Sequence, residues 1–144
     1  MLHKTLAITA LTVATLAGTV SPATAGGGVG ADTLPAFAPN RLVITVTGTG
    51  DADGTYVLVC DPDGGRHPEP EAACDAVQNA QQALAPTSSD ALCTYLYGGP
   101  ATAEVEGTWQ GEPVSAHFDR SNGCEIARWD SLVPALPRIG GDQA

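Results

Sequence analysis

The chain has 144 residues, 43% of them hydrophobic, and its six basic and sixteen acidic residues give a formal net charge of −10 at pH 7. This acidity argues against nucleic acid and anionic membrane surfaces as partners, because both attract basic proteins. The length predicts one small domain with a modest hydrophobic core.

The N-terminus has the pattern of a secretory signal peptide. A short basic start at residues 1–4 leads into an apolar run over 5–20, and Ala23-Thr24-Ala25 supplies a small-x-small cleavage site. Removal of residues 1–25 leaves 119 residues without lysine, in which five arginines against sixteen acidic residues give a net charge of −11. No second apolar run is long enough to cross a membrane, so we expect a soluble protein that is secreted to the extracellular medium.

The remaining chain divides into three parts. Residues 26–36 are rich in glycine and lack apolar periodicity, which predicts a flexible leader. An ordered domain is expected over 37–136. Residues 137–144 are expected to be a frayed tail.

The domain is expected to start with a β-hairpin. The β-branched run at 41–47 predicts a strand, and the turn-rich residues 48–54 follow it. Residues 55–60 predict the antiparallel partner strand, which ends at the turn signals of 61–65.

A helix and a second hairpin are expected next. Apolar residues recur at helical spacing over 71–84, and Pro86 stops the pattern. Residues 101–107 and 114–118 predict two further strands around a turn at 107–111, whereas 129–136 is ambiguous. This order of elements predicts an α+β domain in which a helix covers one face of an antiparallel sheet.

The four cysteines, Cys60, Cys74, Cys93 and Cys124, all lie in the exported part, where disulfides are the default. Their spacings contain no Cys-x2-Cys pair, which argues against a zinc site. Four cysteines allow three connectivities, of which sequential pairing is the simplest. In the loop-entropy account each bridge stabilises the fold by about 3–4 kcal/mol.

The sequence carries no pattern typical of an enzyme, and we expect no cofactor and no metal. Motifs for nucleophilic catalysis, for zinc hydrolysis and for nucleotide binding are all missing. We expect His67 and His117 to be surface residues rather than catalysts. The turns at 51–54 and 61–64 resemble fragments of calcium loops, but neither continues to the acidic twelfth position, so we interpret them as solvated turns.

One short segment, Leu92 to Pro100, stands out from the rest. A cysteine precedes a bulky aromatic residue by two positions, and Gly98-Gly99-Pro100 follows. The pattern fits an exposed loop that is fixed upstream by a disulfide and presents a large side chain. It fits a buried strand with core aromatics equally well.

Four motifs in the right order resemble the Streptomyces subtilisin inhibitor family. They are Phe37-Ala38-Pro39 ahead of the first strand, Gly65-Arg66-His67-Pro68, Gly107-Thr108-Trp109-Gln110-Gly111 and Ser121-Asn122-Gly123-Cys124-Glu125. Together with the four cysteines they cover residues 37–136. The resemblance implies an inhibitor of serine proteases that is not itself an enzyme.

The resemblance also implies a fold and a pairing of cysteines. The family fold is a five-stranded antiparallel sheet with two helices, and its members form homodimers through the sheet. Its disulfides join the first cysteine to the second and the third to the fourth, which here implies Cys60–Cys74 and Cys93–Cys124.

The reactive bond of the family lies two residues after the third cysteine, which implies Tyr95-Leu96 here. Tyr95 is then the P1 residue, whose side chain enters the main specificity pocket of the protease, and Leu96 is P1′. The protease-contacting loop comprises Leu92, Cys93, Thr94, Tyr97 and Gly98. Asn122, whose amide we expect to hydrogen-bond loop carbonyls, and Cys124 support it.

An aromatic P1 residue suits an apolar specificity pocket. We therefore expect strong inhibition of subtilisin-like enzymes, measurable inhibition of chymotrypsin-like enzymes and little inhibition of trypsin. The sequence departs from the family pattern at Thr94, where many relatives have proline, at Gly98-Gly99-Pro100, which is one residue longer, and at Gly123, where an acidic residue is common.

The sequence leaves two alternatives open. One is a secreted binding module with a degenerate loop, which a protease would cut at Tyr95-Leu96 as an ordinary substrate. The other is an inhibitor of a thermolysin-like metalloprotease, with Leu96 in the primed pocket.

Overall fold

The structure is a computed structural model that describes residues 38–140, and every structural statement below concerns that part of the chain. The proposed signal peptide, the leader and Phe37 lie outside the described residues, as do residues 141–144. Neither helix within 38–140 is long and apolar enough to span a membrane.

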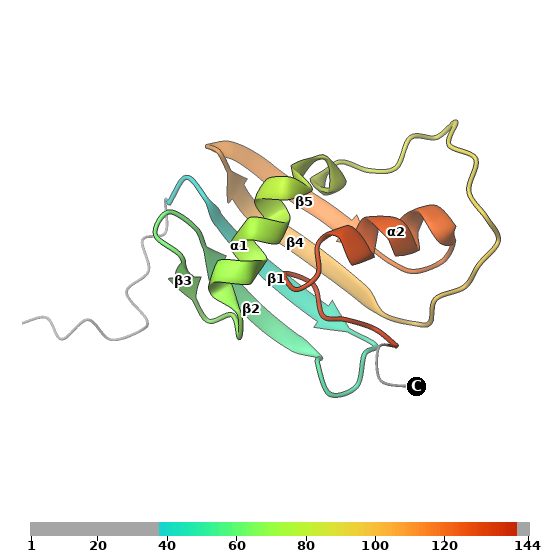
Figure 1. The fold of residues 1–144 in the computed structure, drawn as a ribbon, viewed down its shortest axis with the longest axis horizontal. Coiled ribbons are helices and arrows are strands. Elements are labelled where there is room, and N and C mark those ends of the chain that lie inside the picture. The colour runs from blue at the N-terminus through green and yellow to red at the C-terminus, as the bar shows by residue number, and fades with distance from the viewer. Residues whose placement is uncertain (1–37, 141–144) are drawn as a thin grey trace, which may run out of the picture.

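The described chain forms one five-stranded antiparallel sheet and two α-helices (Figure 1). The strands lie in the order β3-β2-β1-β4-β5. In chain order the elements are β1 (Arg41–Thr47), β2 (Gly54–Val59), β3 (Gly64–Gly65), α1 (Pro70–Asn79), a 3-10 turn (Gln81–Leu84), β4 (Thr102–Trp109), β5 (Glu112–Phe118) and α2 (Gly123–Ser131). The predicted α+β fold is confirmed.

Strand β1 shows how the sequence pattern positions the sheet. Leu42, Ile44 and Val46 are buried, whereas Thr45 and Thr47 between and beyond them are exposed. Successive side chains of a strand point to opposite faces, so this alternation turns one face of the sheet toward the core. Both helices lie over that face (Figure 1).

The core fills the space between the sheet and the two helices. Its largest fully buried side chains include Trp129 and Leu132 from the α2 region, Phe118 from β5 and Leu42 from β1. Burial of each such side chain stabilises the fold by about 1.5–3 kcal/mol. The packing therefore fixes α2 against the end of β5, where the candidate site lies.

The predicted helix over 71–84 is wrong beyond Asn79. α1 ends at Asn79, Ala80 has the non-helical angles φ −124° and ψ 31°, and a 3-10 turn follows. The turn redirects the chain so that it contacts both β5 and α2. Ala83, on this turn, is buried. The tertiary contact outweighs the helix propensity of the segment.

The second hairpin also differs from the prediction. β4 continues to Trp109, and the turn is formed by Gln110 and Gly111, both of which have positive φ. A two-residue turn with two positive φ angles matches the twist of antiparallel strands. Gly107, which we had placed in the turn, lies inside β4, where a Cβ atom would come within 2.0 Å of the Arg41 carbonyl oxygen.

The C-terminal part is more ordered than the sequence predicted. The Trp129 indole nitrogen donates a hydrogen bond to the Pro137 carbonyl oxygen at 2.9 Å, and Ile139 packs against the core. The first residues of the expected frayed tail are therefore held in place. Most of α2 lies ahead of the region 129–136 that we had considered ambiguous.

Candidate functional site

Residues 92–97 form an exposed loop without helix or strand, at the right of Figure 1. The loop carries all the large hydrophobic side chains that are exposed in the described chain. Their exposed fractions are 102% for Leu92, 105% for Tyr95, 61% for Leu96 and 72% for Tyr97. The alternative of a buried strand is therefore wrong.

The upstream side of this loop is tied to the start of α2. Cys93 and Cys124 form a disulfide with 5.3 Å between their Cα atoms. One residue further on, the Gly123 N–H donates a hydrogen bond to the Thr94 carbonyl oxygen at 3.0 Å. The other disulfide joins Cys60 to Cys74 and so links the end of β2 to α1. Both expected pairings are confirmed.

The downstream side is tied to Arg120, which lies two residues after the end of β5. The Gly98 N–H donates to the Arg120 carbonyl oxygen at 2.7 Å, and Nε of Arg120 donates back to the Gly98 carbonyl oxygen at 3.0 Å. Arg120 is 7% exposed. We did not identify it from the sequence. The available signal was the period-two alternation of Ala116 and Phe118, which places position 120 on the inward face.

Asn122 acts differently from what we expected. Its Oδ1 atom accepts hydrogen bonds from the N–H groups of Cys124 at 2.9 Å and Glu125 at 3.1 Å. This is an N-cap, which satisfies backbone donors in the first turn of α2. The hydrogen bonds that the structure gives this side chain therefore orient the helix that carries Cys124, rather than the carbonyl groups of the loop.

A carboxylate fixes the turn between β5 and α2. Oδ1 of Asp119 accepts a hydrogen bond from the Ser121 N–H at 2.8 Å. Partial burial of Asp119 acts to raise its pKa. The hydrogen bonds from Ser121 and the charges of His117 and Arg128 outweigh that effect and hold the pKa below its ordinary value. Asp119 therefore stays ionised in its structural role down to acidic pH.

The side chain of Thr94 fills the space that a side chain at position 123 would need. A Cβ atom on Gly123 would lie 2.0 Å from Oγ1 of Thr94, a distance that no real contact allows. Two of the departures from the family pattern noted above are thus coupled by packing, because the threonine is accommodated only where residue 123 has no side chain.

Comparisons with known proteins agree with the motifs. Residues 38–122 match the family described as subtilisin inhibitor-like. "Subtilisin inhibitor-like protein 1" of Streptomyces cacaoi is 34% identical over 69% of this chain and 98% of that protein. "Subtilase-type protease inhibitor" of Streptomyces fradiae is also 34% identical, over 76% of this chain and 86% of that protein.

The chain belongs to the subtilisin inhibitor-like family.

Among solved structures, Streptomyces caespitosus sermetstatin in complex with Bacillus licheniformis subtilisin aligns with a TM-score of 0.42 at 27% identity, over 67% of this chain and 97% of that chain. The sequence matches alone carry the family assignment.

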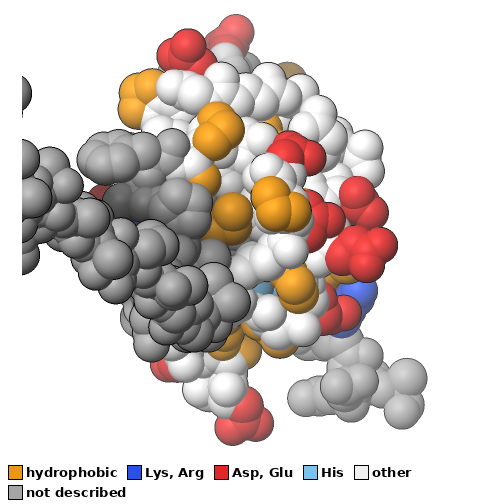
Figure 2. All heavy atoms as spheres, turned by 90° about the vertical axis from the view of Figure 1, so that its left-hand side faces the viewer, with side chains coloured by type: hydrophobic (Ala, Val, Ile, Leu, Met, Phe, Trp, Pro, Cys, Tyr) orange, Lys and Arg blue, Asp and Glu red, His pale blue; other side chains and the backbone are white. Residues whose placement is uncertain are grey.

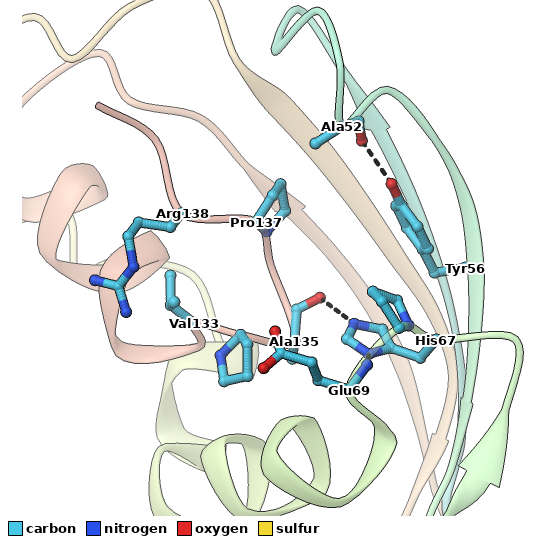
Figure 3. Close-up of a pocket in the computed structure, with 10 residues that line it drawn as sticks. Ala52, Tyr56, His67, Glu69, Val133, Ala135, Pro137 and Arg138 are labelled. Carbon is cyan, nitrogen blue, oxygen red and sulfur yellow. Dashed lines mark hydrogen bonds between the residues drawn. The ribbon is translucent and has the colours of Figure 1, made fainter. Parts of the chain in front are cut away.

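The subtilisin inhibitor-like domain also has a cavity of about 550 Å³ that shares no residue with the loop (Figure 3). The side chains of His67 and Tyr56 in its wall bind main-chain partners. Nε2 of His67 lies 3.2 Å from the Ala135 carbonyl oxygen, Nδ1 lies 3.1 Å from the Glu69 nitrogen, and the Tyr56 hydroxyl donates to the Ala52 carbonyl oxygen at 2.8 Å. His67 is buried, so our expectation of a surface histidine is wrong for it, whereas His117 is exposed as expected.

The acidic turns of the subtilisin inhibitor-like domain have structural partners as well. Asp53 accepts hydrogen bonds from the hydroxyl and the N–H group of Thr49, which lower its pKa. Asp63 lies near the sulfur atoms of Cys60 and Cys74. Those sulfur atoms are bonded to each other, so they offer no thiolate to a metal ion.

Proposed function

We propose that this subtilisin inhibitor-like chain is a secreted inhibitor of subtilisin-like serine proteases, with chymotrypsin-like enzymes as a second class of target, and that Tyr95-Leu96 is its reactive bond. The observation that carries the proposal is the exposed pair of side chains at Tyr95 and Leu96 between two tied flanks. Export is proposed from the signal-peptide pattern of residues 1–25.

The loop has the features of a substrate that is ordered before it binds. Tyr95 is fully exposed, so its ring is free to enter an apolar specificity pocket, and Leu92, Leu96 and Tyr97 offer apolar surface to neighbouring subsites. A flexible peptide loses conformational freedom when a protease binds it. A loop held at Cys93, Thr94 and Gly98 loses less, which strengthens binding.

The same tethers make cleavage unproductive. If the protease serine attacks the Tyr95 carbonyl carbon, the products are an acyl-enzyme on Tyr95 and a free amine on Leu96. Both new ends stay attached to the segment 120–124. The amine can therefore attack the acyl carbon, reform the peptide bond and release the serine hydroxyl. Inhibition of this kind requires no catalytic group in the chain.

We further propose that two copies form a homodimer through the face of the sheet opposite the helices. The inward residues Leu42 and Ile44 belong to the core, so Val43 between them points to the opposite face, in register with Val57 of β2. Val57 is itself buried, so the half-buried Val43 is the side chain of this pair that offers apolar surface for a symmetric contact.

The test is titration of subtilisin with the oxidised protein after removal of residues 1–25, followed by mass spectrometry of the mixture. We expect inhibition at a one-to-one ratio with the Tyr95-Leu96 bond largely intact. Rapid and complete cleavage at that bond would instead identify a binding module whose loop has lost inhibitory function. Parallel titrations of chymotrypsin, trypsin and thermolysin define the target class.

A further inference from the structure

One buried arginine holds both main-chain polar groups of a single loop residue. Nε of Arg120 donates to the Gly98 carbonyl oxygen, and the Arg120 carbonyl oxygen accepts from the Gly98 N–H. Burial reduces the competition of solvent for such bonds, and the charged donor makes the bond from Nε stronger than a neutral one.

The guanidinium group is itself fixed by two further contacts. Nη1 of Arg120 donates to Oδ1 of Asp130 on α2 at 2.7 Å, and the guanidinium carbon lies 5.8 Å from the centre of the Trp129 ring. Trp129 is fully buried. Arg120 therefore connects the loop to α2 and to the hydrophobic core.

The loop approaches this arginine so closely that Gly98 has no room for a side chain. A Cβ atom there would lie 2.8 Å from Cγ1 of Ile126 and 3.0 Å from Cβ of Arg120. Position 98 therefore requires glycine because there is no space for a side chain. Position 99 favours glycine for another reason: its φ is +101°, although no atom lies within 4 Å of a Cβ there. The longer Gly98-Gly99-Pro100 segment thus starts with a residue that is held rather than free.

We propose that Arg120 is a positioning residue that retains the leaving-group side of the reactive bond. The inference rests on the proposed inhibitory function. After cleavage, Leu96 carries the new amine, and Gly98, two residues downstream, stays fixed to Arg120. The amine is therefore kept close to the acyl carbon on Tyr95, where it competes with water: the new C–N bond replaces the C–O bond to the protease serine, and the amine proton returns to the serine oxygen.

The upstream and downstream tethers then have separate tasks. Cys93–Cys124 and the bond from Gly123 to Thr94 hold the acyl side, and Arg120 holds the amine side. All of them converge on residues 120–124, so the two ends are positioned relative to one short rigid segment.

Arg120→Met is the variant that tests this role, with Arg128→Met as its matched control. Both arginine side chains are about nine-tenths buried and both lie over an aromatic ring, but Arg128 donates to the Ala83 and His117 carbonyl oxygens and not to the loop. The first measurement follows hydrolysis of the Tyr95-Leu96 bond by a catalytic amount of subtilisin. One reaction starts from the intact protein and another from the cleaved protein, so that the equilibrium is reached from both sides. The equilibrium ratio of cleaved to intact chain is read by mass spectrometry.

We expect Arg120→Met to raise the cleavage rate and the cleaved-to-intact ratio by about tenfold to a hundredfold. We expect both variants to lose thermal stability, but Arg128→Met should keep the cleaved-to-intact ratio of the unaltered chain. The inference is overturned if Arg120→Met leaves the cleavage rate and the cleaved-to-intact ratio unchanged. The proposed function still stands in that case, provided that the unaltered protein inhibits subtilisin. Failure of the unaltered protein to inhibit overturns the function itself.

A measurement without protease tests the clamp independently. Hydrogen exchange at the Gly98 amide should accelerate about tenfold or more in Arg120→Met and stay unchanged in Arg128→Met. If Arg120→Met does not fold, Gly98→Ala takes its place, with Gly64→Ala as control because no atom lies within 4 Å of a Cβ there. Exchange and cleavage unchanged in Gly98→Ala would refute the clamp.

Discussion

At the scale of single residues, Tyr95 should decide which proteases the chain inhibits. Its side chain is fully exposed and has no cation to offer the aspartate of a trypsin-like pocket. We predict that Tyr95→Arg strengthens trypsin inhibition on the order of 100-fold, because a buried charge pair gains about 2–5 kcal/mol over an unpaired charge. Inhibition constants for trypsin and subtilisin measure the change.

Tyr97→Arg is the control for that experiment. Tyr97 is also largely exposed and lies two residues downstream, so it carries the same new charge at a position that does not enter the main pocket. Trypsin inhibition should improve little in this variant. If Tyr97→Arg improves it more than Tyr95→Arg does, the reactive bond has been placed at the wrong residue.

Gly123 tests the packing of the loop at the same scale. The Cβ atom of Gly123→Ala would collide with Oγ1 of Thr94 and push Thr94, the residue that precedes Tyr95, out of place. We predict inhibition of subtilisin about tenfold weaker or more, since overpacking costs about 1–3 kcal/mol. Thr94→Ala removes the colliding hydroxyl, so the double variant should recover most of the loss. Equal losses in the single and double variants would speak against this coupling.

At the scale of elements, the two disulfides should separate stability from inhibition. Replacing either pair by alanine should lower the free energy of unfolding by about 3–4 kcal/mol in the loop-entropy account. Only loss of Cys93–Cys124 should also accelerate cleavage at Tyr95-Leu96, because Cys60–Cys74 lies between β2 and α1. Thermal unfolding and mass spectrometry, compared at equal fractions of folded protein, measure the two effects. Equal acceleration in both variants would contradict this division.

Asn122 offers a second prediction at this scale. Substitution by aspartate separates two roles of its side chain, because an N-cap needs only an acceptor oxygen whereas a bond to a loop carbonyl needs the amide N–H. Asn122→Ala removes the acceptor for two N–H groups of α2 and should cost about 1 kcal/mol of stability. Asn122→Asp keeps an acceptor and places a negative charge at a helix N-terminus, so stability and inhibition should both be retained. Inhibition lost in Asn122→Asp at unchanged stability would restore the amide-to-loop role that we first assigned.

The elements also show what the sequence can and cannot predict. The β1–β2 hairpin was predictable because apolar and polar residues alternate along β1. The signal-peptide pattern predicts export, and for an exported chain disulfides are the default. The end of α1 at Asn79 was not, because contacts of the following turn with β5 and α2 decide it. Arg120 was missed for a related reason. Its role depends on Gly98, which is 22 residues distant in the chain.

At the scale of the whole molecule, acidity dominates the surface. Acidic side chains are scattered over the face in Figure 2, basic ones are sparse, and the apolar side chains in view form small separate groups. The loop, on the other side of the molecule, instead presents four large apolar side chains together. A net charge of −10 for the full chain opposes association of two copies, since like charges repel over about 10 Å at 0.1 M salt.

The proposed homodimer therefore makes a prediction about salt. If the contact is the apolar centre around Val43, raising the salt concentration from about 0.05 M to about 0.5 M screens the repulsion and should strengthen the dimer. Val43→Glu would place a carboxylate beside Glu106, its register partner on β4, and should weaken the dimer on the order of 100-fold. Gln82→Glu adds the same charge at an exposed position on the 3-10 turn and should leave the dimer constant nearly unchanged. Sedimentation equilibrium measures all three proteins, and a dimer insensitive to Val43→Glu would place the interface elsewhere.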